Sequence, residues 1–161
     1  MKIGILNIQG DVSEHFAMIR KLPKKYGAVP VNVKTINDLD GLSGLIIPGG
    51  ESTVIYMLLK RSGMYDKIIE MANSGLHIMG TCAGAILISK DTGDERVHGM
   101  GIMDITIQRN AYGRQINSFI KQIDINGIGN FNAVFIRAPE IEFTGKAQVL
   151  SSLGNKPVFA V

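Results

Sequence analysis

The strongest chemical signal in the sequence is a cysteine in a glycine-bounded turn. Gly80-Thr81-Cys82-Ala83-Gly84 stands between an apolar run and a stretch of helical type. This follows the strand–turn–helix logic of G-x-S-x-G, with cysteine in place of serine. A sharp turn exposes the thiol, and the start of a helix favours the thiolate. The pattern predicts that Cys82 is a nucleophile and that the Ala83 amide faces a developing oxyanion. The alternative is a buried structural cysteine.

A second glycine-rich turn, Pro48-Gly49-Gly50-Glu51-Ser52, follows another apolar run. In an open α/β sheet, the loops at the carboxyl ends of the strands form the ligand crevice. Two glycines before a helix start offer backbone N–H groups to a carboxylate or an oxyanion. On its own this segment is an ordinary turn with Ser52 as the helix N-cap. Beside the cysteine turn, it is predicted to form the second half of one site.

These two segments together resemble the class I, triad-type glutamine amidotransferases. Further stretches narrow the resemblance to the glutaminase subunits of pyridoxal 5′-phosphate synthases: GILNIQG at 4–10 with Glu14-His15, RNAYGRQ at 109–115, Ser118-Phe119 and FIRAP at 135–139. The similarity extends from residue 3 to about residue 160, which is nearly the whole chain.

The resemblance implies that Cys82 attacks the side-chain amide of glutamine and leaves a glutamyl thioester, which water hydrolyses. Gly50, Glu51 and Ser52 match the family's glutamine-binding loop, and the oxyanion hole would consist of Gly50 and Ala83. The family's other substrate-binding positions match Arg109, Ile136 and Arg137. A guanidinium holds a carboxylate with two hydrogen bonds, which suits the α-carboxylate of glutamine. Without the resemblance, the arginines would be interpreted as surface ion-pair residues.

The partners follow from the same resemblance. Ammonia would pass to a separate synthase subunit that builds the pyridoxal phosphate ring within a large ring complex. We expect no cofactor, no nucleic acid, no membrane and a cytoplasmic location. The fold implied is α/β and flavodoxin-like: a single domain over residues 1–161 with a mostly parallel sheet, helices on both faces and a β-rich C-terminal part.

The histidines depart from the family pattern. The family's base is a histidine followed two residues later by glutamate, whereas none of His15, His77 and His98 has Glu or Asp at that spacing. His15 matches the family's Glu-His pair, and we expect a structural or interface role for it. The three histidines are too scattered to form a zinc site. The stretch 156–161 has the pattern of a strand that has just begun. We therefore expect the natural protein to continue beyond Val161 and to carry the missing His-x-Glu.

Hydrophobic periodicity predicts the elements that must position these residues. Short apolar strands are expected at 2–6, 30–36, 45–47 and 76–79. They are separated by helices at about 12–22, 64–73 and 85–89, and by a helix that Ser52 can cap and whose apolar residues run from 54 to 59. An Asp11–Glu14 capping box is expected at the first helix. Alternation of strand and helix is typical of a parallel sheet covered on both faces. Beyond residue 100, strands are expected at 101–108, 115–125, 132–136 and 147–150.

Composition excludes several classes of protein. The chain of 161 residues carries 17 Lys and Arg against 14 Asp and Glu, so its charge of +3 is too small for a typical phosphate-backbone binder. The longest apolar run, residues 54–59, is far shorter than the ~20 residues that span a bilayer. With one cysteine the chain forms no intrachain disulfide, which suggests a reducing compartment.

Two other functions remain open at this stage. One is a non-catalytic protein that binds glutamine or the synthase and regulates it, having lost its base. The other keeps the cysteine turn but changes the chemistry, as in cysteine hydrolases or redox sensors of similar sheet architecture.

Overall fold

Four short parallel strands form the sheet of the N-terminal part of the computed structural model, which describes residues 1–22, 24–109, 118–136 and 138–161. β1 (Lys2–Leu6), β2 (Val29–Val33), β3 (Gly44–Ile47) and β4 (His77–Gly80) pair in the order β2-β1-β3-β4. All three pairings are parallel, so the strands deliver their carboxyl ends, and the loops that follow, to one edge. The chain forms two compact units, Met1–Ile88 and Ser89–Val161, and this sheet belongs to the first.

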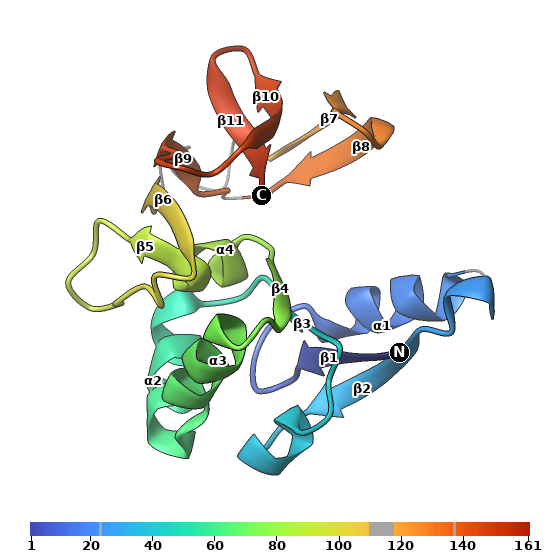
Figure 1. Cartoon of the computed structure of the whole chain (residues 1–161). Helices are drawn as coiled ribbons and strands as arrows, with labels where there is room; N and C mark the ends of the chain where they lie inside the picture. The colour runs from blue at the N-terminus through green and yellow to red at the C-terminus, as the bar shows by residue number, and fades with distance from the viewer. Residues whose placement is uncertain (23, 110–117, 137) are drawn as a thin grey trace. The chain divides into compact units, whose positions relative to one another are not determined.

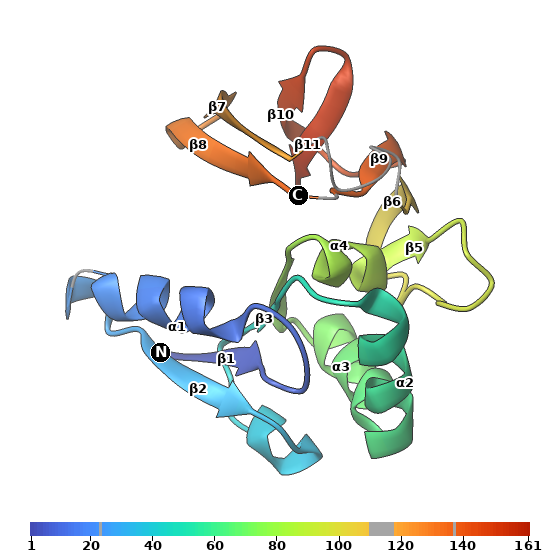
Figure 2. The ribbon, with the colours of Figure 1, turned by 180° about the vertical axis from the view of Figure 1, so that it is seen from behind.

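Helices and strands alternate in the first unit, as the sequence predicts (Figures 1 and 2). α1 (Val12–Lys21) packs through Phe16 and Ile19 on the sheet face that carries Ile5 and Ile46. The residues that alternate with these, Leu6, Leu45 and Ile47, point to the opposite face and are fully or almost fully buried. The sheet is therefore covered on both faces, and the predicted α/β class is confirmed.

Three further helices complete the first unit. α2 (Ser52–Ser62) and α3 (Met64–Asn73) follow β3, joined at Gly63 in the left-handed conformation. α4 (Ala83–Ile88) follows β4 after a two-residue turn. No helix among the described residues is both long and apolar enough to cross a membrane.

The second unit consists of strands, which confirms the β-rich C-terminal part. β5 (Ser89–Asp91), β6 (Met103–Gln108) and β9 (Glu140–Phe143) form one sheet. Two antiparallel hairpins accompany it: β7 (Phe119–Ile125) with β8 (Gly129–Phe135), and β10 (Val149–Leu153) with β11 (Lys156–Ala160).

Several predicted boundaries are wrong for local reasons. The strand predicted at 30–36 ends at Val33, because the Asp38 carboxylate accepts the N–H groups of Lys34 and Thr35 and turns the chain into the short helix η2 (Ile36–Leu39). By contrast, the strand predicted at 156–161 is confirmed as β11: it pairs with β10, and Val161 exchanges two main-chain hydrogen bonds with Gln148. β5 and β9 were not predicted, since three polar residues and a four-residue segment carry little periodic signal.

Candidate active site

The turn between β4 and α4 holds Cys82 in a conformation that few side chains adopt. Its φ is +50°, the one positive φ recorded for a non-glycine residue in the part of the chain that the structure describes. Such a backbone costs about 1–3 kcal/mol and persists only where its surroundings enforce it. Three main-chain hydrogen bonds do so here: Thr81 N–H to Ile47 O, Gly84 N–H to Thr81 O, and Ile86 N–H to Cys82 O. The Cys82 side chain is exposed, which argues against a buried structural cysteine.

Glycine is required on both sides of this turn. A Cβ at Gly80 would lie 2.5 Å from the Gly84 carbonyl carbon, and a Cβ at Gly84 would lie 1.9 Å from the Ile47 carbonyl oxygen. Neither distance is compatible with a side chain. The two glycines thus let α4 pack directly on β3 and β4, and the spacing seen in the sequence has a steric cause.

The glycine-rich loop after β3 lies against the cysteine turn. A Cβ at Gly49 would be 3.4 Å from the Cys82 Cβ and 3.8 Å from the Thr81 carbonyl oxygen. The Gly49 carbonyl accepts the Asp11 N–H at 3.0 Å, which fixes how the peptide between Gly49 and Gly50 is oriented. The sequence therefore correctly predicts that the two turns lie together.

The loop after β1 braces the same glycines. Gly10, with φ +113°, approaches Gly49 so closely that a Cβ would be 1.9 Å from the Gly49 oxygen. The Gln9 side-chain oxygen accepts the Glu51 N–H at 2.9 Å and occupies the space that a side chain at Gly50 would need. No pattern in the sequence indicated these roles for Gln9 and Gly10.

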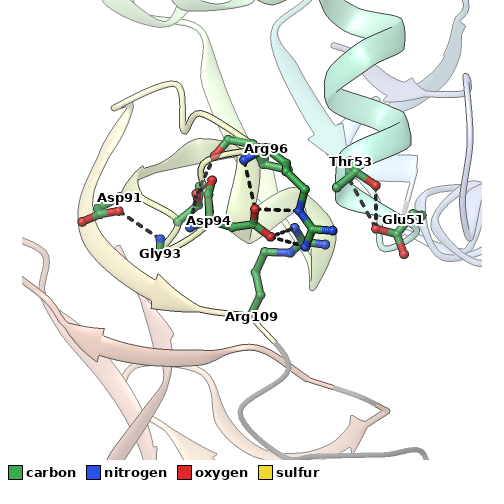
Figure 3. A network of polar contacts seen from close by, with 9 residues as sticks. Glu51, Thr53, Asp91, Gly93, Asp94, Arg96 and Arg109 are labelled. Atoms are coloured by element: carbon green, nitrogen blue, oxygen red, sulfur yellow. Dashed lines mark hydrogen bonds and ion pairs between the residues drawn. The ribbon is translucent and has the colours of Figure 1, made fainter.

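The N-cap predicted for α2 is wrong, and the capping box predicted for α1 does not form. Glu51, not Ser52, is the N-cap of α2, and its carboxylate accepts from the Thr53 N–H at 3.4 Å and from the Thr53 hydroxyl at 3.0 Å (Figure 3). Ser52 is buried as the first residue of the helix. Asp11 is the N-cap residue of α1, but its side chain makes no cap hydrogen bond, so the expected capping box is absent there.

His15 lies beside the cysteine turn. Its Nε2 atom and the Thr81 hydroxyl oxygen are 3.2 Å apart and share a hydrogen bond. Burial lowers the pKa of His15, although the neighbouring carboxylates of Glu14 and Asp11 act in the opposite direction. The expectation of a structural role is consistent with this contact, but 66 positions separate the pair, and no sequence pattern indicated it.

In the second unit, Arg109 is held by an acidic residue that sequence analysis missed. The Asp94 carboxylate accepts from the Arg109 guanidinium and, at 2.9 and 2.7 Å, from that of Arg96 (Figure 3). Hydrogen bonds from the Arg96 side chain and backbone, helped by the Arg109 charge, hold the pKa of Asp94 well below its usual range. The Arg109 side chain is 12% exposed, whereas that of Arg96 is 74% exposed, so Arg109 is the enclosed partner.

The predicted site residues thus fall into two groups. The first unit brings together Gly50, Glu51, Ser52, Cys82 and Ala83 at the ends of β3 and β4. In the second unit, Arg109 follows β6 and Ile136 follows β8, and Ile136 is 55% exposed. Arg137 and the stretch 110–117 lie outside the described residues. Among described residues, no three His, Cys, Asp or Glu side chains gather as metal ligands.

Comparison with known proteins gives consistent matches. A family model for the SNO glutamine amidotransferase family matches residues 5–160. Pyridoxal 5′-phosphate synthase subunit PdxT of Thermoplasma acidophilum is 56% identical over 159 residues, covering 98% of this chain and 78% of the relative. PdxT of Picrophilus torridus is 57% identical, covering 98% and 82%. A crystal structure of a glutamine amidotransferase superposes with a TM-score of 0.89 at 37% identity, covering 99% of this chain and 84% of that one.

Proposed function

The chain belongs to the SNO glutamine amidotransferase family, and from that premise we propose that it hydrolyses glutamine and supplies the ammonia to a pyridoxal 5′-phosphate synthase. The observation that carries the proposal is the strained, exposed Cys82 packed against the Gly49-Gly50 loop. An exposed thiol at the carboxyl end of a parallel sheet, packed against a glycine loop, is suited to acyl transfer through a thioester, in which backbone N–H groups stabilise the oxyanion.

The reaction has two halves. The Cys82 sulfur attacks the side-chain amide carbon of glutamine, and the thiol proton leaves with the departing nitrogen as ammonia. The glutamyl thioester that remains is attacked by water, which releases glutamate and restores the thiol. Each half passes through a tetrahedral oxyanion, for which we assign the amides of Gly50 and Ala83 as donors.

We propose that substrate binding follows the family pattern that the sequence resembles. Gly50, Glu51 and Ser52 form the glutamine-binding loop, and Arg109, Ile136 and Arg137 are the further substrate-binding positions. Arg109 supports the assignment chemically, because a guanidinium already oriented by Asp94 loses little freedom on binding a carboxylate.

The general base is the missing part. None of His15, His77 and His98 is followed two positions later by Glu or Asp. We propose that a His-x-Glu supplied beyond Val161 completes one glutamine amidotransferase domain with residues 1–161. The full protein would then act without a cofactor, in the cytoplasm, as part of a large ring complex with the synthase subunit, and without nucleic acid or membrane.

A glutamine-mimicking electrophile tests the proposal directly. With 6-diazo-5-oxo-norleucine, intact mass and peptide mapping should place one adduct on Cys82, glutamine should protect against it, and Cys82→Ala should abolish it. Labelling that glutamine does not slow would contradict a glutaminase. Rapid loss of the thiol to dilute peroxide without such labelling would instead favour a redox sensor.

Ammonia release tests the partner. The full-length protein with its synthase subunit should release ammonia from glutamine, and Cys82→Ala should reduce the rate to background. If glutamine binds but no ammonia is released even in the complex, the protein is a regulatory subunit and not a glutaminase.

A further inference from the structure

The turn that carries Cys82 is attached to α1 by a side chain. His15 shares its hydrogen bond with the hydroxyl of Thr81, the residue directly before Cys82, and its ring is partly buried. A neutral imidazole accepts or donates at Nε2 according to its tautomer, and a hydroxyl does either. The hydrogen bond therefore forms with either tautomer of the neutral ring.

The main-chain hydrogen bonds of the turn do not fix the Thr81 side chain, and the contact with His15 does. They tie Thr81, Cys82 and Gly84 to β3 and α4 through backbone atoms. The Thr81 side chain is fixed separately, by a residue that comes from another element. Since Cys82 has a φ of +50°, an attachment at the preceding residue opposes relaxation of the turn.

The same segment of chain also supports the glycine loop. Within six residues before His15, Gln9 accepts from the Glu51 N–H and the Asp11 N–H donates to the Gly49 carbonyl. Residues 9–15 therefore contact both halves of the candidate site. Asp11 does so through its backbone, and Gln9 and His15 do so through their side chains.

From this geometry we infer that His15 is a positioning residue for the nucleophile: through Thr81 it holds the cysteine turn in the conformation that keeps the thiol outward. Its effect on turnover rests on the proposed function. Its effect on the reactivity of Cys82 does not, and the two are measured separately.

Four variants isolate the hydrogen bond. His15→Phe keeps a ring but removes the bonding atoms, and His15→Gln restores an amide group near the position of Nε2. Thr81→Val removes the hydroxyl with little change in shape, and Thr81→Ser retains it. Met18→Gln, on the exposed side of α1, serves as the matched control.

The first measurement is the rate of alkylation of Cys82 by iodoacetamide, followed by intact mass on the full-length protein. His15→Phe and Thr81→Val should each slow it about fivefold, a typical effect for one lost hydrogen bond. The double variant should be no slower than either single variant, because both remove the same contact. His15→Gln, Thr81→Ser and Met18→Gln should react as the wild type does.

The second measurement is glutaminase activity with the synthase subunit. His15→Phe and Thr81→Val should each lower kcat about fivefold and leave KM for glutamine unchanged. Additive effects of His15→Phe and Thr81→Val on alkylation, or a wild-type rate in both, would overturn the inference. If His15→Phe does not fold, the alkylation rates of Thr81→Val and Thr81→Ser test the inference: equal rates would overturn it. Altered alkylation in a protein without glutaminase activity would overturn the proposed function alone.

Discussion

At the scale of the residue, the nucleophile turn is governed by one backbone angle. Cys82 adopts a φ of +50°, which glycine tolerates and other residues adopt at a cost. The packing of α4 and the hydrogen bonds around Thr81 offset the conformational cost of this φ. Reactivity and local stability therefore oppose each other at this position.

That opposition predicts a stability order among variants of Cys82. Cys82→Gly should be about 1 kcal/mol more stable than Cys82→Ala, because glycine adopts the positive φ without strain. Urea unfolding of both variants measures the difference. Ala85→Gly, inside α4, is the matched control and should be destabilised by about 1 kcal/mol relative to the wild type. Equal stability of the two Cys82 variants would mean that the turn relaxes without cost.

At the scale of the element, the packing of α4 on β3 depends on a single missing side chain. A methyl group at Gly84 would meet the Ile47 carbonyl oxygen at 1.9 Å, and a backbone atom cannot move aside as a flexible side chain does. Gly84→Ala should cost about 3 kcal/mol. Gly44→Ala in β3, where the nearest atom would be 3.4 Å away, should change stability by less than about 1 kcal/mol. Thermal unfolding of both variants compares them, and similar losses would contradict the steric argument.

Asp94, in the loop between β5 and β6, should make the stability of the fold depend on pH. The pKa of Asp94 is lowered in the folded protein, so its ionised form stabilises the fold at and above the pKa of about 4 that an unfolded Asp has. This contribution is lost as the pH falls from about 4 through the lowered pKa. Asp94→Asn should therefore be less stable than the wild type at pH 7, and the gap should narrow below pH 4.

Urea unfolding between pH 3 and pH 7 measures that gap. A pair of arginine variants controls for the partners: Arg109→Gln should destabilise more than Arg96→Gln, since the Arg109 side chain is enclosed and that of Arg96 faces solvent. A gap that is constant down to pH 3 would show that Asp94 acts through packing and not through its charge.

At the scale of the whole molecule, the question is whether residues 1–161 are sufficient for catalysis. A protein made of these residues alone, mixed with the synthase subunit, should release ammonia from glutamine at no more than background rate, because no residue pair in it matches the His-x-Glu base. Steady release that Cys82→Ala abolishes would show that another group in this chain serves as the base.

The sequence predicts those parts of the molecule whose cause is local. β3 and β4 are apolar runs that end in glycine, α3 has apolar residues at helical spacing, and the cysteine turn requires small residues at fixed positions, so all were found. β5 is three residues long and is defined by its pairing with β6, so it was missed.

The parts of the site that were missed all depend on contacts between distant positions. Thr81 with His15, Gly49 with Asp11, and Arg109 with Asp94 each join segments that no periodicity links. The prediction of Ser52 as the N-cap of α2 was wrong for a similar reason. The Gln9 side chain holds the Glu51 amide, and Glu51 in turn takes the N-cap position that the sequence favours for Ser52.

The hydrogen bond from the Asp11 amide to the Gly49 carbonyl has one more consequence. Both of its atoms belong to the main chain, so no exchange of one genetically encoded side chain for another deletes it, apart from proline at position 11. An ester in place of the peptide bond before Asp11, introduced by semisynthesis with the matching hydroxy acid, would remove the donor and keep every side chain. Alanine scanning would overlook this contact, and only backbone chemistry measures its contribution.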